Sequence, residues 1–167
     1  KLQRLAALTA GLVFIQLIIG AHLRHLPLDF SPHAFRGVLF FHLFMAAALV
    51  VHAGMLTARV AMRHRGERPL LYPAIAISLL VLAQIVLGSG TWIANYSWPH
   101  WAMEMGWGVG HTVQAGSYAS AMIVTAHQAM GSLILGVTVM LTLRAFRMLA
   151  VPTPAHSTSI SLKGVLA

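Results

Sequence analysis

The stretch that decides the fold is Ala126-His127-Gln128-Ala129-Met130, with the apolar run behind it that closes at Met140-Leu141-Thr142-Leu143-Arg144. It places a histidine inside a segment of membrane-spanning length. A polar group without a partner is costly in hydrocarbon, so this histidine needs a partner. The rest of the sequence indicates where that partner lies.

A second copy of the pattern begins at His42, 85 residues earlier (127 minus 42). Both copies carry a Met-Leu-Thr triplet, at 55–57 and at 140–142. The other aligned pairs are His42 with His127, Met45 with Met130, and Arg59 with Arg144. Two helices with one pattern, and a histidine at the same place in each, predict a site that the two helices share.

The composition is that of a membrane protein. Of the 167 residues, 58% are hydrophobic and 8% are charged, whereas a soluble domain carries about 25% charged residues. The net charge is +8, but the basic residues lie at the ends of apolar runs, which indicates membrane topology and not a nucleic-acid-binding face. The absence of cysteine excludes disulfides, thiolate ligands and covalent c-type haem attachment.

Four apolar runs reach the ~20 residues needed to cross a bilayer. They cover residues 5–23, 38–57, 72–94 and 119–143. The sequence therefore predicts an all-α integral membrane protein, with a four-transmembrane-helix bundle over residues 1–150 and a cytoplasmic C-terminal tail over residues 151–167.

Basic residues mark one side of the membrane. They lie before the first run, between the second and third, and after the fourth: Lys1, Arg4, Arg59, Arg63, Arg65, Arg68, Arg144 and Arg147. The positive-inside rule then places both termini and the middle connection in the cytoplasm, and we expect a bacterial plasma membrane. The tryptophans lie in or beside the connection after the third run, as in an aromatic belt at the other face: Trp92, Trp98, Trp101 and Trp107.

The first and third runs also repeat each other. Gln16-Leu17-Ile18-Ile19-Gly20 matches Gln84-Ile85-Val86-Leu87-Gly88 at an offset of 68, so the second hairpin holds 17 more residues (85 minus 68). Because both copies run in the same direction, we expect a pseudo-two-fold axis along the membrane normal. In the longer connection, 95–118, we expect a short interfacial helix that is capped by Ser97, ends at Gly106 and folds over the outer mouth of the bundle.

His42 and His127 are the candidate metal ligands. At 1.5 Å per residue both lie roughly 8–12 Å below the outer surface. Two imidazoles that face each other across a two-fold axis suit bis-His ligation of one haem iron. The alternative is that each histidine is a hydrogen-bonded packing residue, but two symmetry-matched histidines at one depth favour the ligand interpretation.

Glycines and glutamines on the other two helices are further candidates for the cofactor site. Gly20 and Gly88 fall at a similar height, where a missing side chain would let backbone approach a flat macrocycle. Gln16 and Gln84 lie one turn away from them. For all four residues, helix packing and interhelical hydrogen bonding is the alternative.

The sequence leaves more than one role open for two arginines and several histidines outside the candidate ligand pair. Arg24 and Arg36 flank the outer helix ends and either pair haem propionates or anchor the interface. Among the other histidines, His22 is near enough to line the site, and His52 has only Met140 as a plausible partner for a second haem. His100 and His111 could take copper or zinc.

Three stretches resemble the haem A synthase (cytochrome oxidase assembly) family. They are LVFIQLIIGAHLRH at 12–25, QIVLG at 84–88 followed by GTW at 90–92, and TAHQ at 125–128. The resemblance implies one half of two fused four-helix bundles, each with a histidine on its second and fourth helices. It implies His42 and His127 as the axial pair of one half.

The family's substrate half carries a glutamate three residues before the second-helix histidine, where this chain has Leu39. The resemblance is therefore to the C-terminal haem b half, and it implies a part of an oxidoreductase that transfers electrons to support the oxidation of haem O to haem A. The expected cofactor is one bis-His haem b per chain, with haem O or haem A as alternatives; the catalytic residues are not identified.

The implied partners are membrane lipid, a second four-helix half, fused upstream or supplied by a dimer, and assembly factors such as haem O synthase. Two alternatives from other classes stay open. One is a b-type cytochrome subunit or membrane anchor of a respiratory complex. The other is a structural subunit whose histidines bond across helices without a cofactor.

Overall fold

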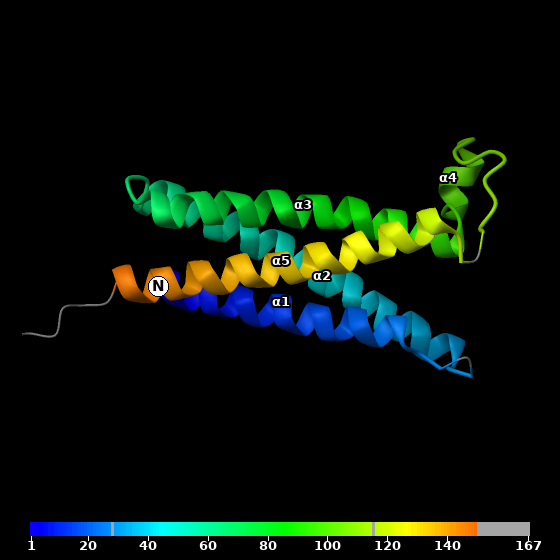
Figure 1. The fold of residues 1–167 in the computed structure, drawn as a ribbon, viewed down its shortest axis with the longest axis horizontal. Helices are drawn as coiled ribbons and strands as arrows, with labels where there is room; N and C mark the ends of the chain where they lie inside the picture. The colour runs from blue at the N-terminus through cyan, green and yellow to red at the C-terminus, as the bar shows by residue number, and fades with distance from the viewer. Residues whose placement is uncertain (28, 115, 150–167) are drawn as a thin grey trace, which may run out of the picture.

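The computed structural model describes residues 1–27, 29–114 and 116–149. Its helices, in chain order, are α1 (Leu2–Arg24), α2 (Pro32–Arg63), α3 (Arg68–Tyr96), α4 (His100–Glu104) and α5 (Tyr118–Met148) (Figure 1). No strand occurs in these ranges. The four longer helices are long and apolar enough to cross a membrane, which confirms the predicted fold class. The predicted tail, 151–167, lies outside the described residues.

The helices form a ring of two hairpins. The α1 helix packs against α2 and α5, and α3 packs against the same two helices. Helices α1 and α3 run in one direction along the bundle, and α2 and α5 run in the other (Figure 1). This arrangement agrees with a half-turn about the long axis that relates the hairpin α1–α2 to the hairpin α3–α5, as the two sequence offsets predict.

Each helix extends beyond its predicted apolar run. The α2 helix starts at Pro32 and ends at Arg63, so it includes residues on both sides of the predicted 38–57 span. Hydropathy marks only the part of a helix that hydrocarbon surrounds, whereas arginine and other polar residues continue the helix into the interface. The apolar runs therefore located the helices but not their ends.

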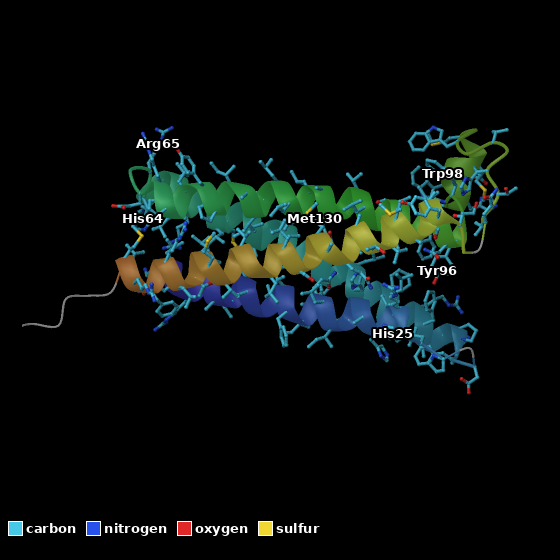
Figure 2. All side chains as sticks on the ribbon, in the orientation of Figure 1. His25, His64, Arg65, Tyr96, Trp98 and Met130 are labelled. Carbon is cyan, nitrogen blue, oxygen red and sulfur yellow. The ribbon has the colours of Figure 1, made fainter. Side chains whose placement is uncertain are left out.

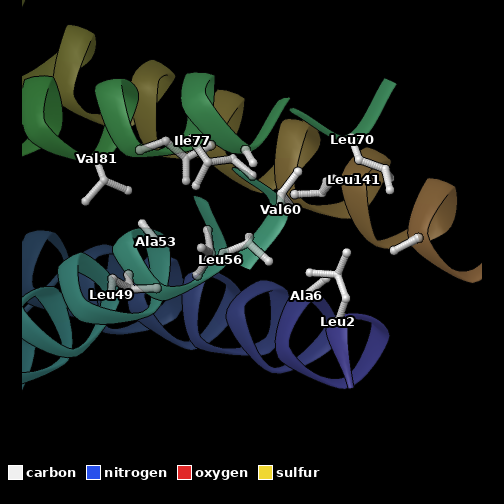
Figure 3. Close-up of a cluster of buried hydrophobic side chains, with 14 residues drawn as sticks. Leu2, Ala6, Leu49, Ala53, Leu56, Val60, Leu70, Ile77, Val81 and Leu141 are labelled. Atoms are coloured by element: carbon white, nitrogen blue, oxygen red, sulfur yellow. The ribbon is translucent and has the colours of Figure 1, made fainter. Parts of the chain in front are cut away.

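The main cluster of buried hydrophobic side chains lies in one half of the bundle, toward the N-terminus (Figure 3). All its α2 members follow His42 in the chain, and all its α5 members follow His127. The core residues are Leu2, Ala6, Val13, Leu49, Ala53, Leu56, Val60, Leu70, Ala74, Ile77, Val81, Ile134, Leu141 and Ala145. We call this half the N-terminal end and the opposite half the α4 end; the two histidines lie at the boundary.

Polar contacts within the N-terminal end fix α3 in place. Pro73 has no backbone N–H, so the Pro69 carbonyl four residues earlier lacks its helical donor. The Arg144 guanidinium on α5 donates a hydrogen bond of 3.0 Å to this oxygen. On the other side of α3, the Thr57 hydroxyl of α2 donates to the Ala74 carbonyl at 2.7 Å.

The labelled aromatic and basic side chains mark the two ends of the bundle. Figure 2 shows Tyr96 and Trp98 at the α4 end, and His64 and Arg65 at the N-terminal end. The predicted short helix is present as α4, but its N-cap is Pro99 and not Ser97, because Ser97 adopts a left-handed φ of 71°. This placement agrees with the expected aromatic belt at one face.

The α4 helix lies beyond α3 rather than between the hairpins (Figure 1). No Cα atom of α4 comes within 8 Å of a Cα atom of α1, α2 or α5. Its connection is held by its own aromatic contacts, since a Cβ at Gly108 would fall 2.1 Å from Trp98 Cδ1. The expectation that this helix covers the mouth of the bundle is therefore not met.

Candidate cofactor site between the hairpins

In the first hairpin, Gln16 of α1 reaches across to His42 of α2. Its side-chain Nε2 donates to the His42 backbone carbonyl at 3.0 Å. The same Nε2 lies 3.3 Å from the imidazole Nε2. The glutamine thus contacts both the main chain and the ring of one histidine.

The second hairpin repeats this arrangement with the aligned residues. Gln84 of α3 donates from Nε2 to the His127 carbonyl of α5 at 2.8 Å, and lies 3.4 Å from the ring Nε2. The contacts of the two hairpins therefore match atom for atom. Sequence similarity alone predicted the matching residues but not these contacts.

Each imidazole lies against a glycine. A Cβ at Gly20 would fall 3.3 Å from His42 Cε1, and one at Gly88 would fall 3.1 Å from His127 Cε1. Both values are shorter than ordinary van der Waals contact, so the missing side chain makes room for the ring. The close approach of these glycines to a macrocycle stays a prediction, because what they contact here is the imidazole.

The site sits between the two hairpins. His42 and His127 lie on helices at opposite corners of the ring, α2 and α5, which have no direct backbone contact. The α1 helix links them, because its Leu17 lies against Gly131 of α5 and the neighbouring Gln16 contacts His42. The geometry therefore brings the two predicted ligands into one region of the bundle.

Several buried polar atoms at this level have no hydrogen-bond partner among the described residues. They are Nδ1 of His42 and His127, Oε1 of Gln16 and Gln84, and Oγ1 of Thr91. Burial of an unsatisfied polar atom costs about 1–3 kcal/mol. Apart from Thr91, these atoms are matched between the two hairpins, and they mark this level as the candidate site.

The two arginines proposed for the site make different contacts in the structure. Arg24, at the end of α1, donates from Nη1 to Oε1 of Gln128, the residue after His127. Arg36 instead contacts its own helix, lying 3.3 Å from His33 Nδ1. Of the two, only Arg24 is thereby placed next to a histidine of the site.

The remaining histidines lie elsewhere. His22 lies edge-on to Phe30, with ring centroids 6.2 Å apart. His52 Nδ1 is 3.5 Å from the Thr9 hydroxyl between α1 and α2, whereas Met140 lines an open groove between α3 and α5.

The outer-loop histidines form no cluster that could hold a metal. His100 pairs with Glu104 at 3.1 Å. Within the described part of the chain, no group of three or more His, Cys, Asp or Glu side chains converges.

One residue of the site was missed by sequence reasoning. A Cβ at Gly131 would fall 3.3 Å from Gln84 Nε2 and 2.9 Å from Leu17 Cδ2, so this glycine makes room for the glutamine. Its aligned position in the first copy is Ala46 (131 minus 85). A small residue at the same place in both copies was the available signal.

The fold and the site together define a class, a membrane-spanning bundle of two repeated hairpins with a symmetric histidine pair between them. Comparisons with protein-family models, with curated proteins and with solved structures find no match to this chain. The family resemblance therefore rests on the three short stretches quoted above.

Proposed function

We propose that His42 and His127 bind one haem as axial ligands in an electron-transferring membrane protein. The observation that carries this proposal is the matched pair of glutamine-held imidazoles in the two hairpins, each with only a long amide contact at its Nε2. Imidazole is a common haem ligand, and iron would satisfy one nitrogen of each ring. When bound, the haem supplies one-electron redox chemistry.

The chain's own residues have definite tasks in this proposal. The two histidines hold the iron, and Gly20 and Gly88 leave space for their rings. The apolar helix walls exclude water and accept the porphyrin. Arg24, beside the His127 turn, is the cation suited to a propionate at the α4 end.

The position of the carboxylates favours electron transfer over catalysis within this chain. The sequence has three acidic residues, which are Asp29 in the α1–α2 connection, Glu67 before α3 and Glu104 at the end of α4. None lies at the level of the histidine pair, and Leu39 stands one turn before His42. A general acid or base for hydroxylation is therefore not supplied from these positions.

In its finer form, the proposal is that the chain acts as the haem b half of a haem A synthase. It would pass electrons to a second four-helix half in which haem O is oxidised to haem A. The lack of a site carboxylate equally favours the second candidate, a b-type cytochrome subunit of a respiratory complex. Oxidation of added haem O by membranes holding this chain and its neighbouring subunits separates the two candidates.

Purification of the chain from membranes tests the haem assignment. We expect a Soret band and a pyridine haemochrome spectrum typical of haem b, and loss of the low-spin spectrum in His127→Ala. The matched control is His100→Ala, because His100 is exposed and pairs only with Glu104. A purified, folded chain without a Soret band contradicts the proposal, as does an unchanged spectrum in His127→Ala.

A further inference from the structure

The two glutamines do more than pack, because the backbone fixes the orientation of each side-chain amide. The atom of Gln84 that lies 2.8 Å from the His127 carbonyl must be a donor, since a carbonyl oxygen only accepts. The same holds for Gln16 and the His42 carbonyl at 3.0 Å. Each amide therefore presents its NH2 group, not its oxygen, to the histidine.

The same NH2 group faces the imidazole Nε2 at 3.3 Å in His42 and at 3.4 Å in His127. An amide NH2 carries two N–H donors and no acceptor, so one hydrogen serves the backbone and the other points at the ring. A ring nitrogen that faces a donor must offer its lone pair. In a neutral imidazole the proton then sits on Nδ1.

Among the described residues, no polar group favours the opposite tautomer by bonding to Nδ1 of either ring. Nδ1 of each histidine is buried and has no partner among the described residues. A glycine lies against that ring edge, with His127 Nδ1 3.6 Å from a Cβ built on Gly88. The glutamine is thus the polar group that distinguishes the two ring nitrogens.

We propose that Gln16 and Gln84 are positioning residues that set the histidine tautomer and present an Nε2 lone pair to the metal. A histidine must be unprotonated at the nitrogen that binds a metal, so the ligand form is already selected before the metal arrives. A metal bound at Nε2 would replace the long amide contact there, while the bond of the amide to the backbone carbonyl would remain. This inference rests on the proposed function for the identity of the metal.

Substitution by glutamate tests the inference most sharply, because glutamate has the size of glutamine but its carboxylate only accepts. In Gln84→Glu, the carboxylate favours a proton on Nε2 of His127 and blocks the lone pair. We expect the His127 tautomer to reverse while His42 keeps its own. Gln84→Leu, which lacks any polar atom, should leave His127 with no tautomer preference.

The measurement is nitrogen NMR of histidine side chains in the full chain, prepared without haem in detergent micelles. Signals are assigned by their loss in His42→Ala and His127→Ala, and Gln114→Glu, in the α4–α5 connection, is the control. We expect an unprotonated Nε2 on both rings of the wild type. A protonated Nε2 in the wild type overturns the inference, as does a His127 tautomer that is the same in wild type and Gln84→Glu.

Titration with haem gives a second, separate readout. Loss of an outer-shell partner typically lowers metal affinity 10–100-fold, and we expect a loss in this range for Gln16→Glu and for Gln84→Glu. Unchanged affinity in both variants contradicts a positioning role. If the wild type shows the expected tautomers but binds no haem, the proposed function fails while the glutamine assignment stands. If it binds haem but shows the opposite tautomers, only the glutamine assignment fails.

Discussion

Adding one methyl group beside each imidazole tests how tightly the site is built. In Gly20→Ala the new Cβ would lie 3.3 Å from His42 Cε1, and in Gly88→Ala it would lie 3.1 Å from His127 Cε1. The ring must therefore move by a few tenths of an ångström in each variant. We expect Gly88→Ala to have the larger effect, because its contact is the shorter one.

Two opposing terms set the change in stability. Alanine is better than glycine in a helix by about 1 kcal/mol, and crowding of a packed site costs about 1–3 kcal/mol. The net change in the free energy of unfolding should then lie between zero and about 2 kcal/mol of destabilisation. Haem affinity should fall about 10–100-fold, since ligand orientation depends on the surrounding shell.

Gly11→Ala is the matched control for Gly20→Ala, because Gly11 lies on the same helix and a Cβ there meets nothing within 4 Å. It should keep the haem spectrum and gain up to about 1 kcal/mol of stability. Haem titration and thermal unfolding in the same detergent measure both quantities. If Gly20→Ala and Gly88→Ala behave like Gly11→Ala, the close fit between ring and glycine is wrong.

Two further predictions concern the opposite end and the topology. Arg144→Gln removes the guanidinium that bonds the exposed Pro69 carbonyl, and should lower the free energy of unfolding by about 0.5–1.5 kcal/mol. Thermal unfolding checks this against Arg147→Gln, which should have little effect. Because the chain has no cysteine, a single introduced cysteine reports on which side of the membrane its position lies. A membrane-impermeant maleimide added to intact cells should label His111→Cys but not Arg65→Cys. The reverse labelling pattern contradicts cytoplasmic termini.

The sequence repeats predicted the architecture because a repeated pattern has a simple structural consequence. Two hairpins with offsets of 68 and 85 residues must pack in equivalent ways when hydrocarbon surrounds them. The ring of four helices and the shared level of His42 and His127 follow from that symmetry. The same reasoning identified Gln16, Gln84 and the two glycines as residues of the site.

The contacts within the site were not predictable, because they depend on the rotation of each helix about its axis. Neither the bond from Gln84 to the His127 carbonyl nor the contact of Arg24 with Gln128 has a sequence signature. The N-cap of α4 was misplaced because Ser97 is a common cap residue, yet its backbone here is left-handed.

The central claim is that one haem iron is held by two histidines on different hairpins. The most direct measurement is the haem content per chain of the purified wild type, His42→Ala and His127→Ala, together with the electron paramagnetic resonance spectrum of each. The account predicts one low-spin haem per wild-type chain, and loss of the low-spin signal when either histidine is removed. A low-spin signal that survives both single substitutions, or a wild-type chain without haem, would contradict it.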